Sequence, residues 1–114
     1  MKKFLVIYHA PIEALAQMAN VAPEDQAKGM DAWMQWAKKC GDSLTDMGSP
    51  LINGTQIDTQ GQVTNSTKSV SGYSILQASD MEEAKKMMDG HPHLNGWHPA
   101  CTIELHEFMP LPGM

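Results

Sequence analysis

The sequence lacks the features that would place the protein in a membrane or on nucleic acid. It has no apolar run of roughly eighteen residues or more, so we expect no membrane-spanning helix. Eight basic residues stand against thirteen acidic ones, giving a formal net charge of −5. No basic stripe is present, which argues against a nucleic-acid partner. The apolar start of the chain breaks at His9 and Pro11 with no small-residue cleavage site, so we interpret it as a strand rather than a signal peptide.

Cysteine and known catalytic signatures are also scarce. Only Cys40 and Cys101 occur, and without a secretion signal we expect both to be free thiols in a cytoplasmic protein. The sequence contains no phosphate-binding loop, dinucleotide fingerprint or Cys-x-x-Cys motif, so we expect no nucleotide or redox cofactor. Phenylalanine occurs twice against ten methionines, and a methionine-rich core is the interpretation we favour.

The residues that are present predict one globular α+β domain over 1–114. Apolar residues make up 42% of the chain and charged residues 18%, which is typical of a folded domain. Strands are expected at Lys3–His9, Leu51–Asp58, Val70–Gln77 and from Cys101 onward. A short helical segment is expected between Pro11 and Asn20, and a long helix from Pro23 to Gly48, with Met30, Met34, Leu44 and Met47 on its buried stripe.

The second helix has the clearest end signals. Ser79 is expected to cap it, with Glu82 as the capping-box partner, and Gly90 is expected to end it in a left-handed conformation. The resulting order, β-α-β-β-α-β, is the ferredoxin-like pattern of a four-stranded antiparallel sheet with helices on one face. Because both faces of Lys3–His9 are apolar, the face without helices should need a partner. The polar stretch Thr59–Ser69 is expected to be an exposed, mobile hairpin tip.

Two histidines follow the second helix directly. His91 and His93 flank Pro92, which we expect to hold them extended on one side of a loop, where the helix C-terminus favours imidazolium. One of them could transfer a proton near neutral pH, oriented by a carboxylate such as Asp31 or Glu104. The alternatives are that the histidines only solvate or cap an exposed loop, and that Asp31 is a solvated helix residue. A metal site would need further ligands, such as His9, so we expect no metal.

Tryptophans are the candidate walls of a ligand pocket beside this loop. Trp36 lies off the main stripe of the long helix and is the better ligand-contact candidate, whereas Trp33 lies on that stripe and could simply pack in the core. Trp97 and His9 complete the set of residues that we expect to contact a small molecule.

Several motifs together resemble the YCII-related family of the dimeric α+β barrel superfamily. They are the opening KKFLVIYHAP, Trp33-Met-Gln-Trp36, Gly48-Ser-Pro50, Gly72-Tyr-Ser-Ile, Ala78-Ser-Asp-Met, Gly90-His-Pro-His-Leu94, Ile103-Glu-Leu-His-Glu and Met109-Pro-Leu-Pro112. The resemblance implies a homodimer whose two sheets face each other. Members of the wider family carry a His–Asp pair in a pocket, whereas the long helix here offers Asp31, Trp33 and Trp36. The Asp-Gly-Pro-Phe loop of one large branch is also absent.

Two classes of function follow from these observations. The first is a cofactor-free small-molecule enzyme of lyase or isomerase type that uses a histidine as general acid and base. The second is a non-catalytic dimeric protein that binds a small molecule or assists another protein. A histidine beside a carboxylate in a pocket favours the first class, and histidines open to solvent favour the second.

Overall fold

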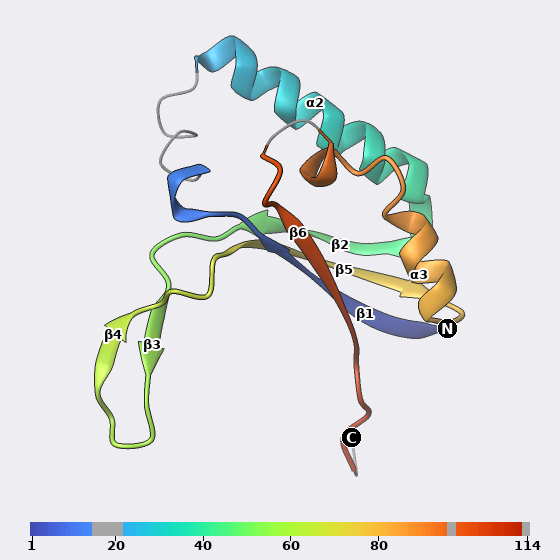
Figure 1. The fold of residues 1–114 in the computed structure, drawn as a ribbon. Helices are drawn as coiled ribbons and strands as arrows, with labels where there is room; N and C mark the ends of the chain where they lie inside the picture. The colour runs from blue at the N-terminus through green and yellow to red at the C-terminus, as the bar shows by residue number, and fades with distance from the viewer. Residues whose placement is uncertain (15–21, 96–97, 113–114) are drawn as a thin grey trace.

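The computed structural model describes residues 1–14, 22–95 and 98–112 and shows an α+β architecture (Figure 1). Its elements are β1 Lys2–His9, α2 Pro23–Cys40, η1 Gly41–Ser43, β2 Leu44–Pro50, β3 Thr55–Ile57, β4 Val63–Asn65, β5 Val70–Ala78, α3 Met81–Met87, η2 Pro92–Leu94 and β6 Thr102–Glu107, where η marks a short 3-10 helix. Most of the segment expected to be helical between Pro11 and Asn20 lies outside the described residues.

The main sheet has four strands in the order β2-β5-β1-β6, and every neighbouring pair is antiparallel. Both α2 and α3 lie on the same side of this sheet (Figure 1). The order and the one-sided helices are compatible with the ferredoxin-like pattern. The predicted α+β class and four-stranded antiparallel sheet are confirmed. No helix within the described ranges is long and apolar enough to cross a membrane.

The core forms between the sheet and the helices because β1 and β5 alternate in burial. Phe4, Val6 and Tyr8 on β1 are buried, as are Leu76 and Ala78 on β5. Helical residues complete this core cluster: Trp36, Ala84 and Met88. The predicted methionine-rich core is found only in part: Met88 is buried, and Met81 and Met87 pack half-buried against the cluster. Met30 and Met34, which were expected on the buried stripe of α2, are both exposed.

The opposite face of the sheet carries apolar side chains without a helix over them. Leu5 and Ile7 on β1 stand beside Ile75 and Tyr73 on β5, and all four are half-buried. Figure 1 shows both helices on the other side of the sheet. We refer to this surface, centred on these four residues, as the uncovered face.

The long helix ends earlier than its apolar pattern predicted. It begins at Pro23 as expected but stops at Cys40, where Gly41 takes a φ of 58° and its N–H bonds to the Ala37 carbonyl. Leu44 therefore begins a strand, and the second strand is Leu44–Pro50 rather than Leu51–Asp58. Gly48 does not end a helix. It lies inside β2 at a φ of 77°, where an added Cβ would stand 1.7 Å from the Tyr73 carbonyl oxygen.

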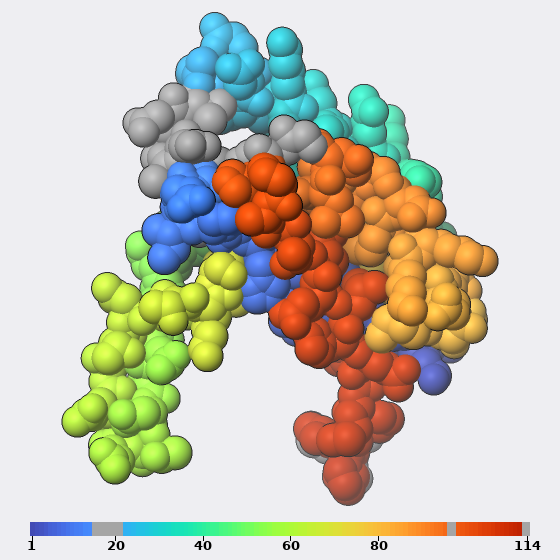
Figure 2. Space-filling view, in the orientation of Figure 1, coloured from blue at the N-terminus to red at the C-terminus, as the bar shows by residue number. Residues whose placement is uncertain are grey.

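The polar stretch between β2 and β5 forms a separate two-stranded hairpin of β3 and β4. It projects from the body of the molecule, as Figures 1 and 2 show. Its paired residues Ile57 and Val63 are 67% and 63% exposed. The predicted exposed hairpin is confirmed, and its mobility stays a prediction.

The second helix is capped one residue later than expected. The Asp80 carboxylate, rather than the Ser79 hydroxyl, accepts from the N–H of Glu83, so α3 begins at Met81. Gly90 has a φ of 74°, which confirms the predicted left-handed stop. The next residues are not extended as predicted. Pro92–Leu94 is a turn of 3-10 helix, because the side chain of His91 caps it by accepting from the N–H of His93.

Candidate functional site

His91 is the start of a buried chain of hydrogen bonds. Its Nδ1 accepts from the backbone N–H of His93 at 3.0 Å, so the neutral ring carries its proton on Nε2. Nε2–H then donates to the Tyr8 hydroxyl at 3.1 Å, and Tyr8 donates to the Ser74 hydroxyl at 2.8 Å. Ser74 donates to the Met47 carbonyl at 2.7 Å. The carbonyl can only accept, so every proton in this chain points the same way.

Aromatic rings surround His91 on several sides. Ring centroids lie 4.3 Å away for Trp36, 4.5 Å for Trp33 and 5.1 Å for Tyr8. Burial lowers the pKa of His91 to about 3, with a smaller contribution from His93. The expectation that the helix C-terminus favours imidazolium is therefore wrong for this residue, because loss of solvation outweighs the helix dipole.

His93 is also enclosed rather than open to a substrate. Its Nε2 donates to the His9 carbonyl at 2.9 Å, and burial lowers its pKa. His91 and His93 are 0% and 3% exposed, so neither forms the accessible loop pair that we expected. The hydrogen bonds of His91 and His93 to β1, and the contacts of His91 with the tryptophans of α2, hold η2 in place.

Trp33 packs against the core as expected, whereas Trp36 is more deeply buried than a residue off the main stripe should be. Trp36 is 3% exposed and its indole donates to the Met87 carbonyl at 2.8 Å, so it belongs to the core, whereas Trp33 is only half-buried. Trp36 still lines a surface hollow of about 410 Å³ between α2 and the loop at Gly90 and Pro92. Asp31 lies exposed on α2 and does not line it. Both ring nitrogens of His91 bond to other groups, so Asp31 does not orient that ring. Trp97 lies outside the described residues.

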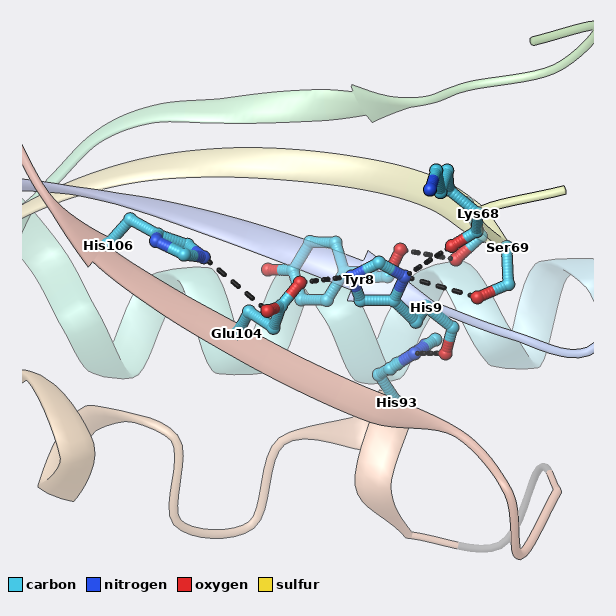
Figure 3. Close-up of polar contacts among 8 residues, drawn as sticks. Tyr8, His9, Lys68, Ser69, His93, Glu104 and His106 are labelled. Atoms are coloured by element: carbon cyan, nitrogen blue, oxygen red, sulfur yellow. Dashed lines mark hydrogen bonds and ion pairs between the residues drawn. The ribbon is translucent and has the colours of Figure 1, made fainter. Parts of the chain in front are cut away.

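A second histidine cluster lies on the uncovered face, and we call it the His9 cluster (Figure 3). It consists of His9, Ser69, Glu104 and His106. The His9 Nε2 bonds to one carboxylate oxygen of Glu104, and the other oxygen lies 3.5 Å from the His106 Nε2. On the other side of the ring, the His9 Nδ1 lies 3.0 Å from the Lys68 carbonyl and 3.2 Å from the Ser69 hydroxyl.

Solvent reaches this cluster. The side chains of His9, Glu104 and His106 are 17%, 51% and 57% exposed. The hydrogen bond from His9 lowers the pKa of the Glu104 carboxyl, and the charges of His9 and His106 act in the same direction. Glu104 is therefore a carboxylate at neutral pH that fixes one nitrogen of His9 as a donor.

The backbone is irregular where His9 meets Ser69. The pairing of β1 with β5 shifts register between Tyr8 and His9. Ser69 has a φ of 60°, which non-glycine residues rarely adopt, and its carbonyl accepts from the N–H of Ala10 at 2.9 Å. Bulges and strained residues cluster at functional sites because they redirect side chains that a regular strand would misplace. The shift occurs at His9, whose Nδ1 faces Lys68 and Ser69 just before β5.

Sequence reasoning placed His9 in a ligand site and named Glu104 as an orienting carboxylate, but did not bring the two together. It missed Ser69, Tyr8 and Ser74. The unusual φ of Ser69 cannot be predicted from the sequence. Tyr8 could have been found, because a tyrosine in a strongly apolar strand is expected to be buried and its hydroxyl then needs a hydrogen-bond partner.

Within residues 1–14, 22–95 and 98–112, no group of three or more histidine, cysteine, aspartate or glutamate side chains could hold a metal ion. A further hollow of about 390 Å³ lies between α3 and β6. Its lining is mostly apolar: Lys85, Met88, Leu94, Cys101, Thr102, Ile103 and Leu105.

No protein-family model matches the chain, and no curated protein matches it significantly.

Proposed function

We propose that the protein is a cofactor-free small-molecule enzyme of lyase or isomerase type, in which His9 transfers a proton and Glu104 orients its ring. The observation that carries this proposal is the pair of groups facing the His9 Nδ1. The Lys68 carbonyl at 3.0 Å can accept from a protonated nitrogen, and the Ser69 hydroxyl at 3.2 Å can donate to a bare one.

Both protonation states of His9 therefore have a partner in the same geometry. In the imidazolium form, Nε2–H donates to Glu104 and Nδ1–H donates to Lys68. After Nδ1 has given its proton to the substrate, Ser69 rotates its hydroxyl to donate to the bare nitrogen, and Glu104 still accepts from Nε2–H. A general acid and base must alternate between these two states, and imidazole is the side chain whose ordinary pKa suits that task near neutral pH.

A substrate for this site needs a hydrogen that leaves as a proton, such as one on carbon beside a carbonyl group. The uncovered face next to His9 offers the apolar side chains of Ile7 and Tyr73 to the rest of such a molecule. Ser69, half-buried beside the ring, is a positioning residue that completes the exchange of hydrogen-bond partners.

Deuterium exchange tests this activity without knowledge of the physiological substrate. The protein is incubated in D₂O with a panel of small carbonyl compounds, and mass spectrometry follows incorporation at carbon. We expect the parent to catalyse exchange on a subset of the panel, and His9→Gln to lose about 10²–10⁴-fold in rate. His98→Gln is the matched control, because the His98 side chain accepts from the nearby backbone N–H of Ala100, makes a long contact with Glu13 and lies outside the His9 cluster. Equal exchange by the parent and His9→Gln would contradict the proposal.

We also propose that the protein belongs to the YCII-related family and forms a dimeric α+β barrel through the uncovered faces of two copies. The half-buried Leu5, Ile7, Tyr73 and Ile75 support this arrangement, because a second sheet would remove them from water. The free thiols of Cys40 and Cys101 suit the reducing conditions of the cytoplasm, where we place the protein.

The second candidate is a non-catalytic protein that binds a small molecule or assists another protein. The hollow beside Trp36 favours it, because that hollow lies away from His9 and its lining residues include one charged side chain of each sign, Lys39 and Asp89. A ligand that stabilises the parent and His9→Gln equally, without deuterium exchange in either, would select this candidate.

A further inference from the structure

The two edges of the main sheet differ in how they are protected. At one edge, β2 shifts register against β5 twice, contains Gly48 at a positive φ and ends at Pro50. Such irregularity prevents another strand from adding to an edge. At the other edge, β6 pairs with six consecutive residues of β1 with no register shift, and it contains no proline. Figure 2 shows this strand along the exposed front of the molecule. The β6 edge is therefore regular, and no strand formed by the described residues lies beyond it.

The ladder between β1 and β6 shows which residues address the free edge. The N–H of Phe108 donates to the Lys3 carbonyl at 2.9 Å. In an antiparallel pair, hydrogen-bonded positions alternate along the strand, so Glu104 and His106 also direct their backbone groups toward β1. Ile103, Leu105 and Glu107 then direct their N–H and C=O groups outward, where another strand can bond to them.

The polar side chains on β6 specify which strand fits this edge. We consider two copies of β6 that pair antiparallel about a two-fold axis. The outward backbone groups of one copy then face those of the other only when the axis passes through a residue, and near the middle of the strand that residue is 104, 105 or 106. A centre at Glu104 places two carboxylates opposite each other, and a centre at His106 places two imidazoles opposite each other. A centre at Leu105 places Glu104 of each copy opposite His106 of the other.

We propose that β6 is a self-association edge, to which β6 of a second copy adds antiparallel with Leu105 opposite Leu105. On each side of that centre, the outward N–H and C=O groups of Ile103 in one copy bond to those of Glu107 in the other. A carboxylate facing an imidazole, which can donate a hydrogen bond to it, stabilises this register, since directly opposed side chains are the interacting unit of a sheet. Ile103 and Leu105 also line the apolar hollow beside α3, so the hollows of the two copies approach each other across the axis.

The backbone groups of this edge are separate from the uncovered face, although the side chains of Glu104 and His106 also belong to the His9 cluster on that face. Packing two sheets face to face uses side chains and leaves the outward N–H groups of β6 in water. Pairing through β6 uses those N–H groups and leaves the uncovered face open. Both contacts can therefore form in one assembly, and each can be tested without the other.

Glu107→Pro tests the edge, because proline removes an outward N–H that does not take part in the ladder of β6 with β1. Glu107→Ala is the matched control, since it loses the same exposed ion pair with Lys2 but keeps the N–H. In sedimentation velocity we expect the parent and Glu107→Ala to form the larger species at micromolar concentration, and Glu107→Pro to lose it. If the parent and Glu107→Pro have the same mass, the proposal is overturned.

Hydrogen exchange read by NMR distinguishes edge pairing from face packing. We expect the amides of Ile103, Leu105 and Glu107 to exchange slowly in the assembled parent and at least about tenfold faster on dilution to the smaller species. Fast exchange at these three positions in the assembled protein would show that the edge is free and would overturn the proposal.

His106→Glu tests the register and does not depend on tolerance of proline. It places two carboxylates opposite each other at both ends of the pairing, and we expect the dissociation constant of the edge contact to rise at least about tenfold. His106→Lys keeps a hydrogen-bond donor opposite Glu104, so this variant should associate at least as tightly as the parent. Equal association of His106→Glu and the parent would overturn the register and the proposal with it.

Discussion

The buried His91 makes the protein sensitive to mild acid, and the size of the effect follows from its surroundings. Burial lowers its pKa to about 3, against an ordinary value of 6.5 in the unfolded chain. The unfolded state therefore binds the proton more readily, so the stability contributed by the neutral ring is complete above pH 6.5 and is lost as the pH falls. Between pH 7.5 and pH 5 the loss is about 2 kcal/mol, because each pH unit below the unfolded pKa costs about 1.4 kcal/mol.

Urea unfolding followed by tryptophan fluorescence measures this loss, because Trp36 packs against the ring. The parent is compared with His91→Gln, which can still hydrogen-bond to Tyr8 but cannot be protonated in this range. We expect the free energy of unfolding to fall by about 2 kcal/mol more in the parent than in the variant between pH 7.5 and pH 5. Keeping the pH at 5 or above limits the contribution of carboxylates. Parallel pH profiles for the parent and His91→Gln would refute the reasoning.

The remaining predictions concern stability, assembly and motion. Tyr8→Phe removes the hydroxyl that links two buried partners and should lower the free energy of unfolding by about 1–3 kcal/mol in urea. Gly48→Ala should destabilise by at least about 2 kcal/mol in thermal unfolding, since its Cβ meets backbone. Its control Gly29→Ala, where nothing lies within 4 Å, should stabilise α2 by up to about 1 kcal/mol. Ile75→Glu should reduce the sedimenting mass by blocking contact through the uncovered face, and an unchanged mass would argue against that contact. Hydrogen exchange should be faster in residues 59–69 than in β5, and equal protection would count against a mobile tip.

The sequence predicted the elements whose signals agree and misplaced those whose signals conflict. The predicted bounds of β1 and β5, Lys3–His9 and Val70–Gln77, each differ from the observed strand by one residue, and both strands alternate in burial. After Cys40 the pattern is ambiguous, because Leu44 and Met47 fit a helical stripe while the same segment also forms a strand. Two glycines could end the helix, and the first of them, Gly41, does so.

The candidate site could be predicted only in part because it depends on pairing distant in sequence. His9 and Glu104 are 95 residues apart and meet through the register of β1 with β6, which composition and spacing do not reveal. The histidines after α3 were noticed for their density. The burial of His91 depends on the positions of Trp33 and Trp36 around the axis of α2. A periodic apolar pattern does not predict those positions precisely enough. A rotation by about 100° per residue separates a core position from a surface one.

The hairpin of β3 and β4 also bears on how the chain tolerates changes in length. The hydrogen bond from the Leu51 N–H to the Ser71 carbonyl lies where the chain leaves the main sheet. The hydrogen bond from the Ser66 N–H to the Gly54 carbonyl joins the two chain segments at the base of the hairpin. Everything beyond that base can be shortened, extended or replaced by a tag without removing a strand of the sheet. Lys68 and Ser69 lie between the two closures, so such a graft leaves the surroundings of His9 in place.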